Sequence, residues 1–241
     1  MKILYEDNHI LVVYKPEGVL SQADISKDID LLTELKKYIK EKYNKPGDVY
    51  LGLVHRLDRN TSGVMVFART SKAAERLSKQ IKEHNGFNKK YLAVVEGKMN
   101  IGEEKELVNK LLKNEKENKS YVSKSSSALE SRLKYHVLDT KEINSKYYSL
   151  LDIELFTGRH HQIRCQLSYI GHPIAGDTKY GAKMLGGKAY NLSSYSLSFI
   201  HPTLKEEMTF TYFEPKHLFS QFSKSDLLKK YNLIKKEDIT K

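Results

Sequence analysis

Apolar residues near the amino terminus come in short runs that alternate with turn residues. Residues 3–5 and 9–14 are rich in β-branched and aromatic side chains, and polar residues 6–8 lie between them. This pattern is typical of a β-hairpin. Further runs of this kind predict strands over residues 49–54, 63–68, 90–96, 132–138 and 147–156, and a closing hairpin of residues 194–200 and 207–212.

Other segments repeat apolar residues every three or four positions, which is the spacing of one helix face. The predicted helices are residues 30–43, a segment from the cap Ser71 to about residue 83, a segment between the turn at residues 157–158 and Gly171, and residues 227–234 in the C-terminal tail. Ser71 is the expected N-cap of the second helix, since its hydroxyl can accept a hydrogen bond from the first turn. Gly171 ends the third helix, and Pro173 prevents its continuation.

Strands outnumber helices and often follow one another directly, so the expected fold is α+β with a mixed, largely antiparallel central sheet. Residues 100–127 are dominated by Glu, Lys, Asn and Ser. They predict a strand or short helix and then a flexible loop over residues 114–119, as an excursion from the main sheet. The length of 241 residues suits one large domain or two small ones. We expect a single domain over residues 1–215 and a helical tail over residues 216–241 packed on or beside it.

Charge and cysteine content narrow the class of protein. Lys and Arg number 41 against 30 Asp and Glu, which gives a net charge of +11. Such a surplus suggests a polyanionic partner, although it can also serve solubility alone. The single cysteine, Cys165, excludes an intramolecular disulfide and a thiolate zinc cluster. No apolar run approaches the roughly 18 residues of a membrane span, and the first residues lack the plan of a signal peptide. We therefore expect a cytoplasmic protein.

A polar cluster at residues 55–63, HRLDRNTSG, interrupts two apolar runs. Its Asp58 has Arg56 and Arg59 nearby in sequence, and a positive neighbourhood keeps a carboxyl group ionised at neutral pH. An ionised carboxylate can act as a nucleophile or a general base. The alternative is a surface aspartate that caps a turn and pairs with an arginine.

A second cluster, GRHHQIR at residues 158–164, places several hydrogen-bond donors at the expected start of a helix. Such donors suit a phosphate or a buried carboxylate. A third cluster, at residues 171–181, is a glycine-rich ordered loop in which Asp177 can be a simple cap. The histidines have no carboxylate at metal-ligand spacing, so zinc is disfavoured. The sequence contains no phosphate loop, no dinucleotide fingerprint and no nucleophile elbow, and no cofactor is expected.

In their order along the chain, these clusters resemble the RluA-type family of RNA pseudouridine synthases. The matching blocks are residues 14–19 (YKPEGV), 55–63, 90–97 (KYLAVVEG), 158–164 and 171–181 (GHPIAGDTKYG). The resemblance implies an enzyme without cofactors that isomerises uridine to pseudouridine in ribosomal or transfer RNA. It also implies a largely antiparallel catalytic domain crossed by an RNA cleft. We expect no appended module before the first block, and we therefore expect this domain to recognise RNA itself, as a monomer.

The same resemblance implies roles for single residues. Asp58 matches the catalytic aspartate, Tyr91 the tyrosine that stacks on the target base, and Arg164 the arginine that pairs with the catalytic carboxylate. Expected RNA contacts are Arg56, Arg59, Lys15, Arg159, His160 and Gln162. Two features depart from the family pattern: His160 stands where the family commonly has threonine, and residues 128–133 fit the family strand poorly.

Simpler interpretations stand beside these roles. Tyr91 can be a core tyrosine, Arg164 a helix-surface arginine that meets phosphate, and Lys15 a residue that pairs with an acid. A protein that only binds or folds RNA on the same scaffold would explain the charge without needing Asp58. A metal-dependent nuclease is disfavoured because the sequence lacks a carboxylate cluster. The sequence does not identify the RNA substrate. It also leaves two mechanisms open: attack of Asp58 on the sugar, or removal of a sugar proton by Asp58.

Overall fold

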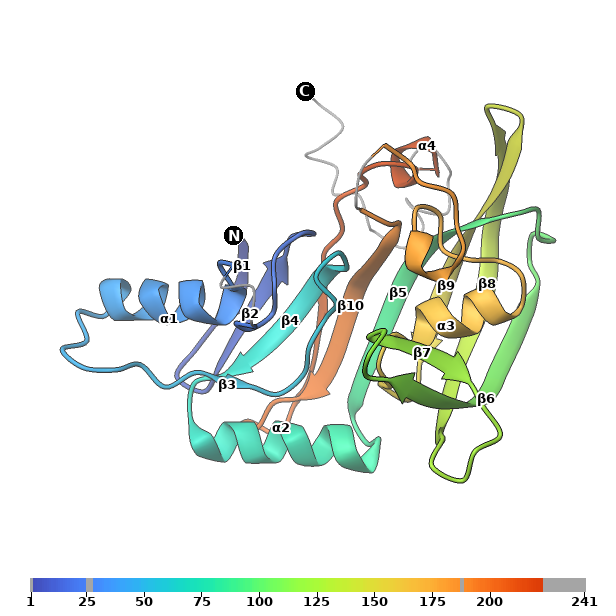
Figure 1. Cartoon of the computed structure of the whole chain (residues 1–241). Coiled ribbons are helices and arrows are strands. Elements are labelled where there is room, and N and C mark those ends of the chain that lie inside the picture. Colours follow the sequence, from blue (N-terminus) through green and yellow to red (C-terminus); the bar gives the residue numbers. More distant parts are fainter. Residues whose placement is uncertain (1, 25–27, 187–188, 223–241) are drawn as a thin grey trace. The chain divides into compact units, whose positions relative to one another are not determined.

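The chain divides into two compact units. The structure is a computed structural model that describes residues 2–24, 28–186 and 189–222. Unit 1 is Met1–Asn88 with Ser196–Tyr212, and unit 2 is Lys89–Tyr195 with Phe213–Lys241 (Figure 1). The helix predicted over residues 227–234 lies outside the described residues.

Unit 1 is built on short antiparallel strands. They are β1 (Lys2–Glu6), β2 (Ile10–Lys15), β3 (Gly52–Leu53), β4 (Ser62–Ala68), β11 (Glu207–Thr211) and the part of β10 (Leu192–Ile200) that falls in this unit. The two predicted hairpins, β1–β2 and β10–β11, are confirmed. β2 pairs with β4 from Ile10 opposite Ala68 to Lys15 opposite Gly63. The strand predicted over residues 49–54 is much shorter, because only Gly52 and Leu53 pair with β4.

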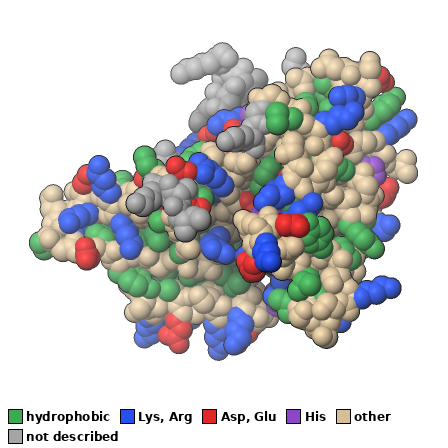
Figure 2. Space-filling model, in the orientation of Figure 1, with side chains coloured by type: hydrophobic (Ala, Val, Ile, Leu, Met, Phe, Trp, Pro, Cys, Tyr) green, Lys and Arg blue, Asp and Glu red, His purple; other side chains and the backbone are tan. Residues whose placement is uncertain are grey.

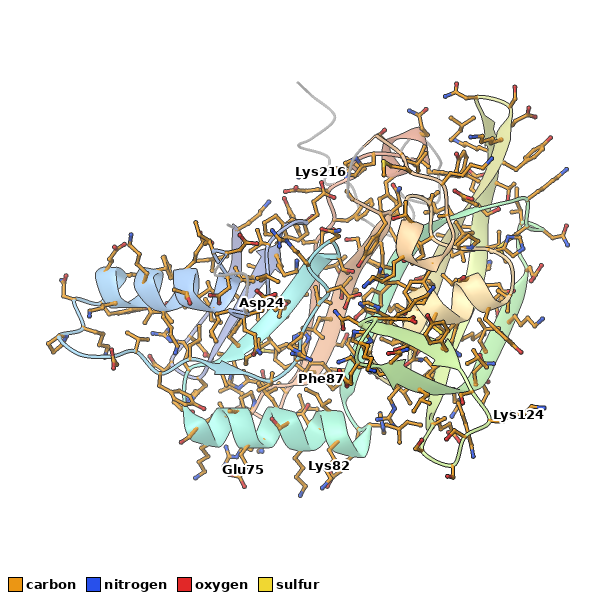
Figure 3. All side chains as sticks on the ribbon, viewed as in Figure 1. Asp24, Glu75, Lys82, Phe87, Lys124 and Lys216 are labelled. Atoms are coloured by element: carbon orange, nitrogen blue, oxygen red, sulfur yellow. The ribbon has the colours of Figure 1, made fainter. Side chains whose placement is uncertain are left out.

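Two amphipathic helices belong to unit 1, as the periodicity predicts. Helix α1 (Leu31–Lys42) is capped by Asp30 and buries Leu35 and Ile39 among its apolar residues. Helix α2 (Ser71–Glu83) is capped by Thr70 and not by the expected Ser71, because the Thr70 hydroxyl accepts a hydrogen bond from the Ala73 amide at 3.1 Å. The exposed residues of α2 include Glu75 and Lys82, whose side chains point away from the ribbon (Figure 3).

Unit 2 contains an antiparallel sheet in the order β5-β9-β8-β6-β7. Its strands are β5 (Phe87–Glu96), β6 (Glu104–Asn114), β7 (Lys119–Val122), β8 (Leu129–Ile143) and β9 (Lys146–Leu155). The prediction that residues 100–127 leave the main sheet is wrong. They form the β6–β7 hairpin, and β6 pairs with β8 from Glu104 opposite His136 to Leu111 opposite Leu129. Residues 107 and 111 are buried and 108 and 110 exposed, which is the two-residue period of a strand.

The helices of unit 2 are short: α3 (Gln162–Tyr169), the single 3-10 turn η1 (Thr178–Tyr180) and α4 (Phe219–Phe222). Helix α3 begins later than predicted, because His161 has a left-handed backbone with φ 51° and cannot belong to the helix. Residues 158–161 therefore form the turn that leads into α3. Gly171, with φ 85°, follows its end as expected. No helix among the described residues is both long and apolar enough to cross a membrane.

Candidate active site

The basic surplus does not by itself mark a site. Figure 2 shows Lys and Arg side chains spread over the visible face, with Asp and Glu among them. The position of each predicted site residue within its own unit is therefore the stronger guide. Asp58 belongs to unit 1, whereas Tyr91 and Arg164 belong to unit 2.

Asp58 lies in the loop between β3 and β4. Its side chain is half-buried, while its neighbours Leu57 and Arg59 are buried and exposed respectively. The Thr61 amide donates to the Asp58 carbonyl at 3.0 Å and closes a turn. Two more contacts hold the residues before it: the Val66 amide donates to Nε2 of His55 at 3.1 Å, and Leu57 is bound through both of its backbone groups.

The partner of Leu57 is the hydroxyl of Ser21, a buried residue. Ser21 Oγ donates to the Leu57 carbonyl at 2.8 Å and accepts from the Leu57 amide at 3.2 Å. Because both backbone groups of one residue are fixed, the loop has little freedom directly before Asp58. The main chain thus gives the carboxyl group a defined position in unit 1.

Lys15 holds the other side of this loop. Its side chain is completely buried at the end of β2, and Nζ donates to the carbonyl oxygens of Pro16 at 3.0 Å, Val19 at 2.7 Å and Arg59 at 2.9 Å. An ammonium group has three N–H donors, and these three carbonyls match them. The prediction that Lys15 contacts RNA is therefore wrong, because the ammonium is shielded from solvent and bound to the backbone.

The ammonium group also contributes to the electrostatics of Asp58. Burial lowers the pKa of Lys15 to about 7, and the nearby carboxylates of Asp58 and Glu17 oppose this by raising it. The interaction is mutual, so a charged Lys15 favours the ionised form of Asp58. Sequence reasoning attributed the positive neighbourhood to arginines and missed this lysine. The signal available was its place directly after a buried strand, in the block that precedes Pro16.

The exposed arginines of the loop have different surroundings. Arg59 Nε donates to the Gly18 carbonyl at 3.0 Å, and Nη1 forms an ion pair with Asp28 at 2.7 Å. Arg56 is exposed. Both side chains are accessible for RNA, as predicted, but the contact itself stays a prediction.

In unit 2, Arg164 is a buried helix residue and not the surface arginine of the simpler interpretation. Its exposed fraction is 6%, and that of Asp177 is 2%. Nε donates to Oδ2 of Asp177 at 2.7 Å and Nη2 to Oδ1 at 2.9 Å, a bidentate pair. The guanidinium carbon also lies 4.5 Å from the centroid of the Tyr190 ring. Asp177 is therefore more than a cap: it fixes the plane of the Arg164 guanidinium.

Gln162 is the first residue of α3, and its amide holds the turn before the helix. Oε1 accepts from the Thr157 hydroxyl at 2.7 Å and the Arg159 amide at 3.1 Å. Nε2 donates to the Arg132 carbonyl at 3.1 Å and to Gln166 at 3.0 Å. Because Gln162 is 3% exposed and its amide is bound within the protein, the prediction that it contacts RNA is wrong. Arg159 is exposed, and Nε donates to the Glu130 carbonyl at 3.0 Å.

His160, which replaces the family threonine, is half-buried against the β6–β7 hairpin. Its Nδ1 lies 2.9 Å from the hydroxyl of Ser120, which also donates to the His160 carbonyl at 2.7 Å. Since His160 and His161 precede α3, the i, i+4 relation of His160 to Arg164 that a longer helix would give does not exist. These contacts join the turn before α3 to β7, and the predicted contact of His160 with RNA stays a prediction.

Tyr91 lies in the middle of β5 opposite Ile153 of β9, and it is 5% exposed. Among the described residues, no group of three or more His, Cys, Asp and Glu side chains is arranged to hold a metal ion.

Comparison with known proteins gives the same family as the sequence blocks. The profile of the RNA pseudouridylate synthase family matches residues 9–169. Ribosomal large subunit pseudouridine synthase C of Buchnera aphidicola subsp. Schizaphis graminum is 33% identical over 219 residues, which are 86% of this chain and 65% of that protein. An uncharacterized RNA pseudouridine synthase of Aquifex aeolicus is 34% identical over 236 residues, which are 92% of this chain and 72% of that protein.

Solved structures share the fold. Human RNA Pseudouridylate Synthase Domain Containing 4 has a TM-score of 0.72 at 22% identity, with 92% of this chain and 91% of that chain covered. The α+β, largely antiparallel fold expected from the sequence is thereby confirmed. The chain spans about two thirds, 65%, of the Buchnera relative. Since the family profile matches well over half of its residues, the chain belongs to the RNA pseudouridylate synthase family.

Proposed function

We propose that this protein is an RNA pseudouridine synthase in which Asp58 is the catalytic carboxylate. The observation that carries the proposal is the loop around Asp58: it belongs to the HRLDRNTSG block, its backbone is bound on both sides, and a buried ammonium group lies near its half-buried carboxyl group. Several relatives bear the name ribosomal large subunit pseudouridine synthase. Ribosomal RNA is therefore the first substrate to test, and transfer RNA the second.

The reaction is an isomerisation, so no atom has to be supplied. The bond between N1 of the uracil and C1′ of the ribose breaks, the base turns, C5 bonds to C1′, and the proton leaves C5 while N1 gains one. Asp58 can attack C1′ or remove the proton at C2′, and both roles require the ionised form. Lys15 supports that form when it carries its proton. The target uridine has to leave its stack first, which costs a few kcal/mol in nucleic acids.

Tyr91 and Arg164 complete the proposal. A tyrosine ring can stack on the uracil, and its hydroxyl can assist the loss of the proton from C5. The orienting role of Arg164 stays a prediction. This role is supported by the fixed plane of the Arg164 guanidinium, which Asp177 holds within unit 2. The paired N–H donors of a guanidinium in a fixed orientation bind a carboxylate with defined geometry.

Replacement of the proposed catalytic carboxylate tests the function directly. Asp58→Asn should lower pseudouridine formation by at least about 100-fold, because an amide is neither a nucleophile nor a base of comparable strength. RNA affinity and the melting temperature should stay close to wild type. The measurement is pseudouridine content by mass spectrometry after incubation with ribosomal RNA. Asp48→Asn, at an exposed position of unit 1, is the matched control, and activity within about tenfold of wild type for Asp58→Asn would rule out its catalytic role.

Two substitutions separate the proposed roles of Tyr91. Tyr91→Phe keeps the ring and should retain RNA affinity while slowing turnover at saturating RNA. Tyr91→Leu removes the ring and should lose both, since base–aromatic stacking contributes about 1–3 kcal/mol. Melting temperatures and Tyr148→Phe, another buried strand tyrosine of unit 2, control for damage to the core. Wild-type turnover in Tyr91→Phe would restrict Tyr91 to stacking or to the core.

A third substitution tests the role of Lys15 as a positioning residue. Lys15→Met should lower the free energy of unfolding by roughly 2–4 kcal/mol, because buried carbonyl groups lose their donor. The salt dependence of RNA binding should not change, since Lys15 has no surface to offer to phosphate. Urea denaturation and binding titrations measure these quantities, with Lys37→Met on exposed α1 as control. Wild-type stability together with a reduced salt slope would instead make Lys15 a phosphate contact.

A further inference from the structure

The proposed mechanism assigns no role to Lys89 of unit 2. This residue lies on β5 two residues before Tyr91, and side chains two apart on a strand share one face of the sheet. Lys90, between them, projects to the opposite face and is exposed, whereas Lys89 is half-buried. The two lysines therefore differ in burial although they are adjacent in sequence.

Among the residues that the structure describes, Lys89 makes neither a hydrogen bond nor an ion pair. Two other lysines of unit 2 show the contrast: Nζ of Lys134 lies 2.6 Å from Glu104, and Nζ of Lys179 donates to two carbonyls at 3.2 Å. Burial lowers the pKa of Lys89 to about 8. The partial loss of hydration at this ammonium is thus not offset by an acceptor in the described part of the chain, so a ligand that brings an acceptor would be favoured here.

Gly158 leaves room beside the ammonium group. A Cβ atom placed on this exposed glycine would lie 3.2 Å from Nζ of Lys89, closer than such contacts normally come. A residue with a Cβ atom at position 158 would therefore force the Lys89 ammonium to move by a few tenths of an ångström. The next residue, Arg159, is also exposed. A glycine at such a position allows a ligand to approach closely.

We propose that Lys89 binds a phosphate of the RNA backbone next to the target uridine, reached across Gly158. The proposal rests on the proposed function, because it takes RNA as the substrate and Tyr91 as the base contact. Residues two apart on a strand are separated by roughly 6–7 Å, a distance suited to a base and a neighbouring phosphate. The phosphate oxygens supply the acceptors that the described residues do not offer to the ammonium.

The competing role for Lys89 is proton transfer to or from the uracil. The two roles differ in what a substitution changes. Loss of a phosphate contact weakens RNA binding and lowers its salt dependence, whereas loss of a proton-transfer group lowers turnover at saturating RNA. Measurement of affinity and turnover on the same variants therefore decides between them.

The experiment compares Lys89→Gln and Lys89→Arg with Lys90→Gln as the matched control. Affinity for a fluorescein-labelled RNA stem–loop with uridines in its loop is measured by anisotropy over a range of KCl concentrations. Lys89→Gln should bind about tenfold more weakly, and its plot of log affinity against log salt should be shallower by about 0.7–0.9. Lys89→Arg should retain most of the affinity, and Lys90→Gln should resemble wild type. Turnover of ribosomal RNA at saturation should be unchanged in Lys89→Gln.

The melting temperature of Lys89→Gln distinguishes a lysine that binds a ligand from one that stabilises the fold. Because Lys89 has no partner among the described residues, Lys89→Gln should melt at the wild-type temperature or above it. Gly158→Ala should displace the ammonium and weaken binding by itself, and it should have no further effect in the Lys89→Gln background. A Gly158→Ala effect that persists in that background would overturn the proposed approach across Gly158.

The inference and the proposed function fail in different ways. Unchanged affinity and salt slope in Lys89→Gln, with wild-type protein active on ribosomal RNA, would overturn the phosphate contact alone. Reduced turnover at saturating RNA with unchanged affinity would overturn it in favour of proton transfer. A wild-type protein that binds RNA with the expected slope but forms no pseudouridine would overturn the proposed function, while the Lys89 variants would still decide the contact.

Discussion

The buried ammonium group of Lys15 is the interaction on which the proposed catalytic loop depends. A charged group without solvent is strongly destabilising unless every donor is satisfied, and here three backbone carbonyls satisfy it. One of them belongs to Arg59, so the turn after β2 and the loop before β4 are joined through a single nitrogen atom. Reciprocal hydrogen bonds between Gly18 and Arg59 strengthen the same junction. The position of Asp58 follows from this junction.

Unit 2 uses buried polar side chains in the same way. The bidentate pair of Arg164 and Asp177 ties α3 to the residues before η1, and the amide of Gln162 ties the start of α3 to β8. These groups hold backbone segments in place and are largely shielded from solvent. The basic and polar residues therefore fall into two groups: buried ones that position a loop, and exposed ones, such as Arg159, that are accessible to RNA.

Much of the fold could be predicted from periodicity, because the spacing of apolar residues shows which face of a helix or strand is buried. Helix α1 and the hairpins β1–β2 and β10–β11 follow from local pattern and turn chemistry. The family blocks also identified Asp58, Tyr91 and Arg164 as candidates, and their roles are predictions. The strand character of β6 was obscured by its many charged residues, even though its buried leucines alternate with exposed positions.

The errors concern long polar side chains. Lys15 and Gln162 were expected at the surface because their residue types are usually exposed. The spacing of residues predicts the face of a helix or strand from which a side chain projects. It does not predict which atoms the terminal polar group of a long side chain contacts. The Arg59 carbonyl that receives Lys15 is 44 residues away in sequence, and the Arg132 carbonyl that receives Gln162 is 30 residues away. Such partners are set by tertiary structure, as is the left-handed residue His161 that delays α3.

The most direct test of the central claim is a map of pseudouridines in RNA from cells that contain the protein and from cells that lack its gene. If the protein is an RNA pseudouridine synthase, one or a few uridines of ribosomal or transfer RNA should lose their modification in the deleted strain. The modification should return when an intact copy of the gene is restored. Identical maps of both RNA classes in the two strains would contradict the account.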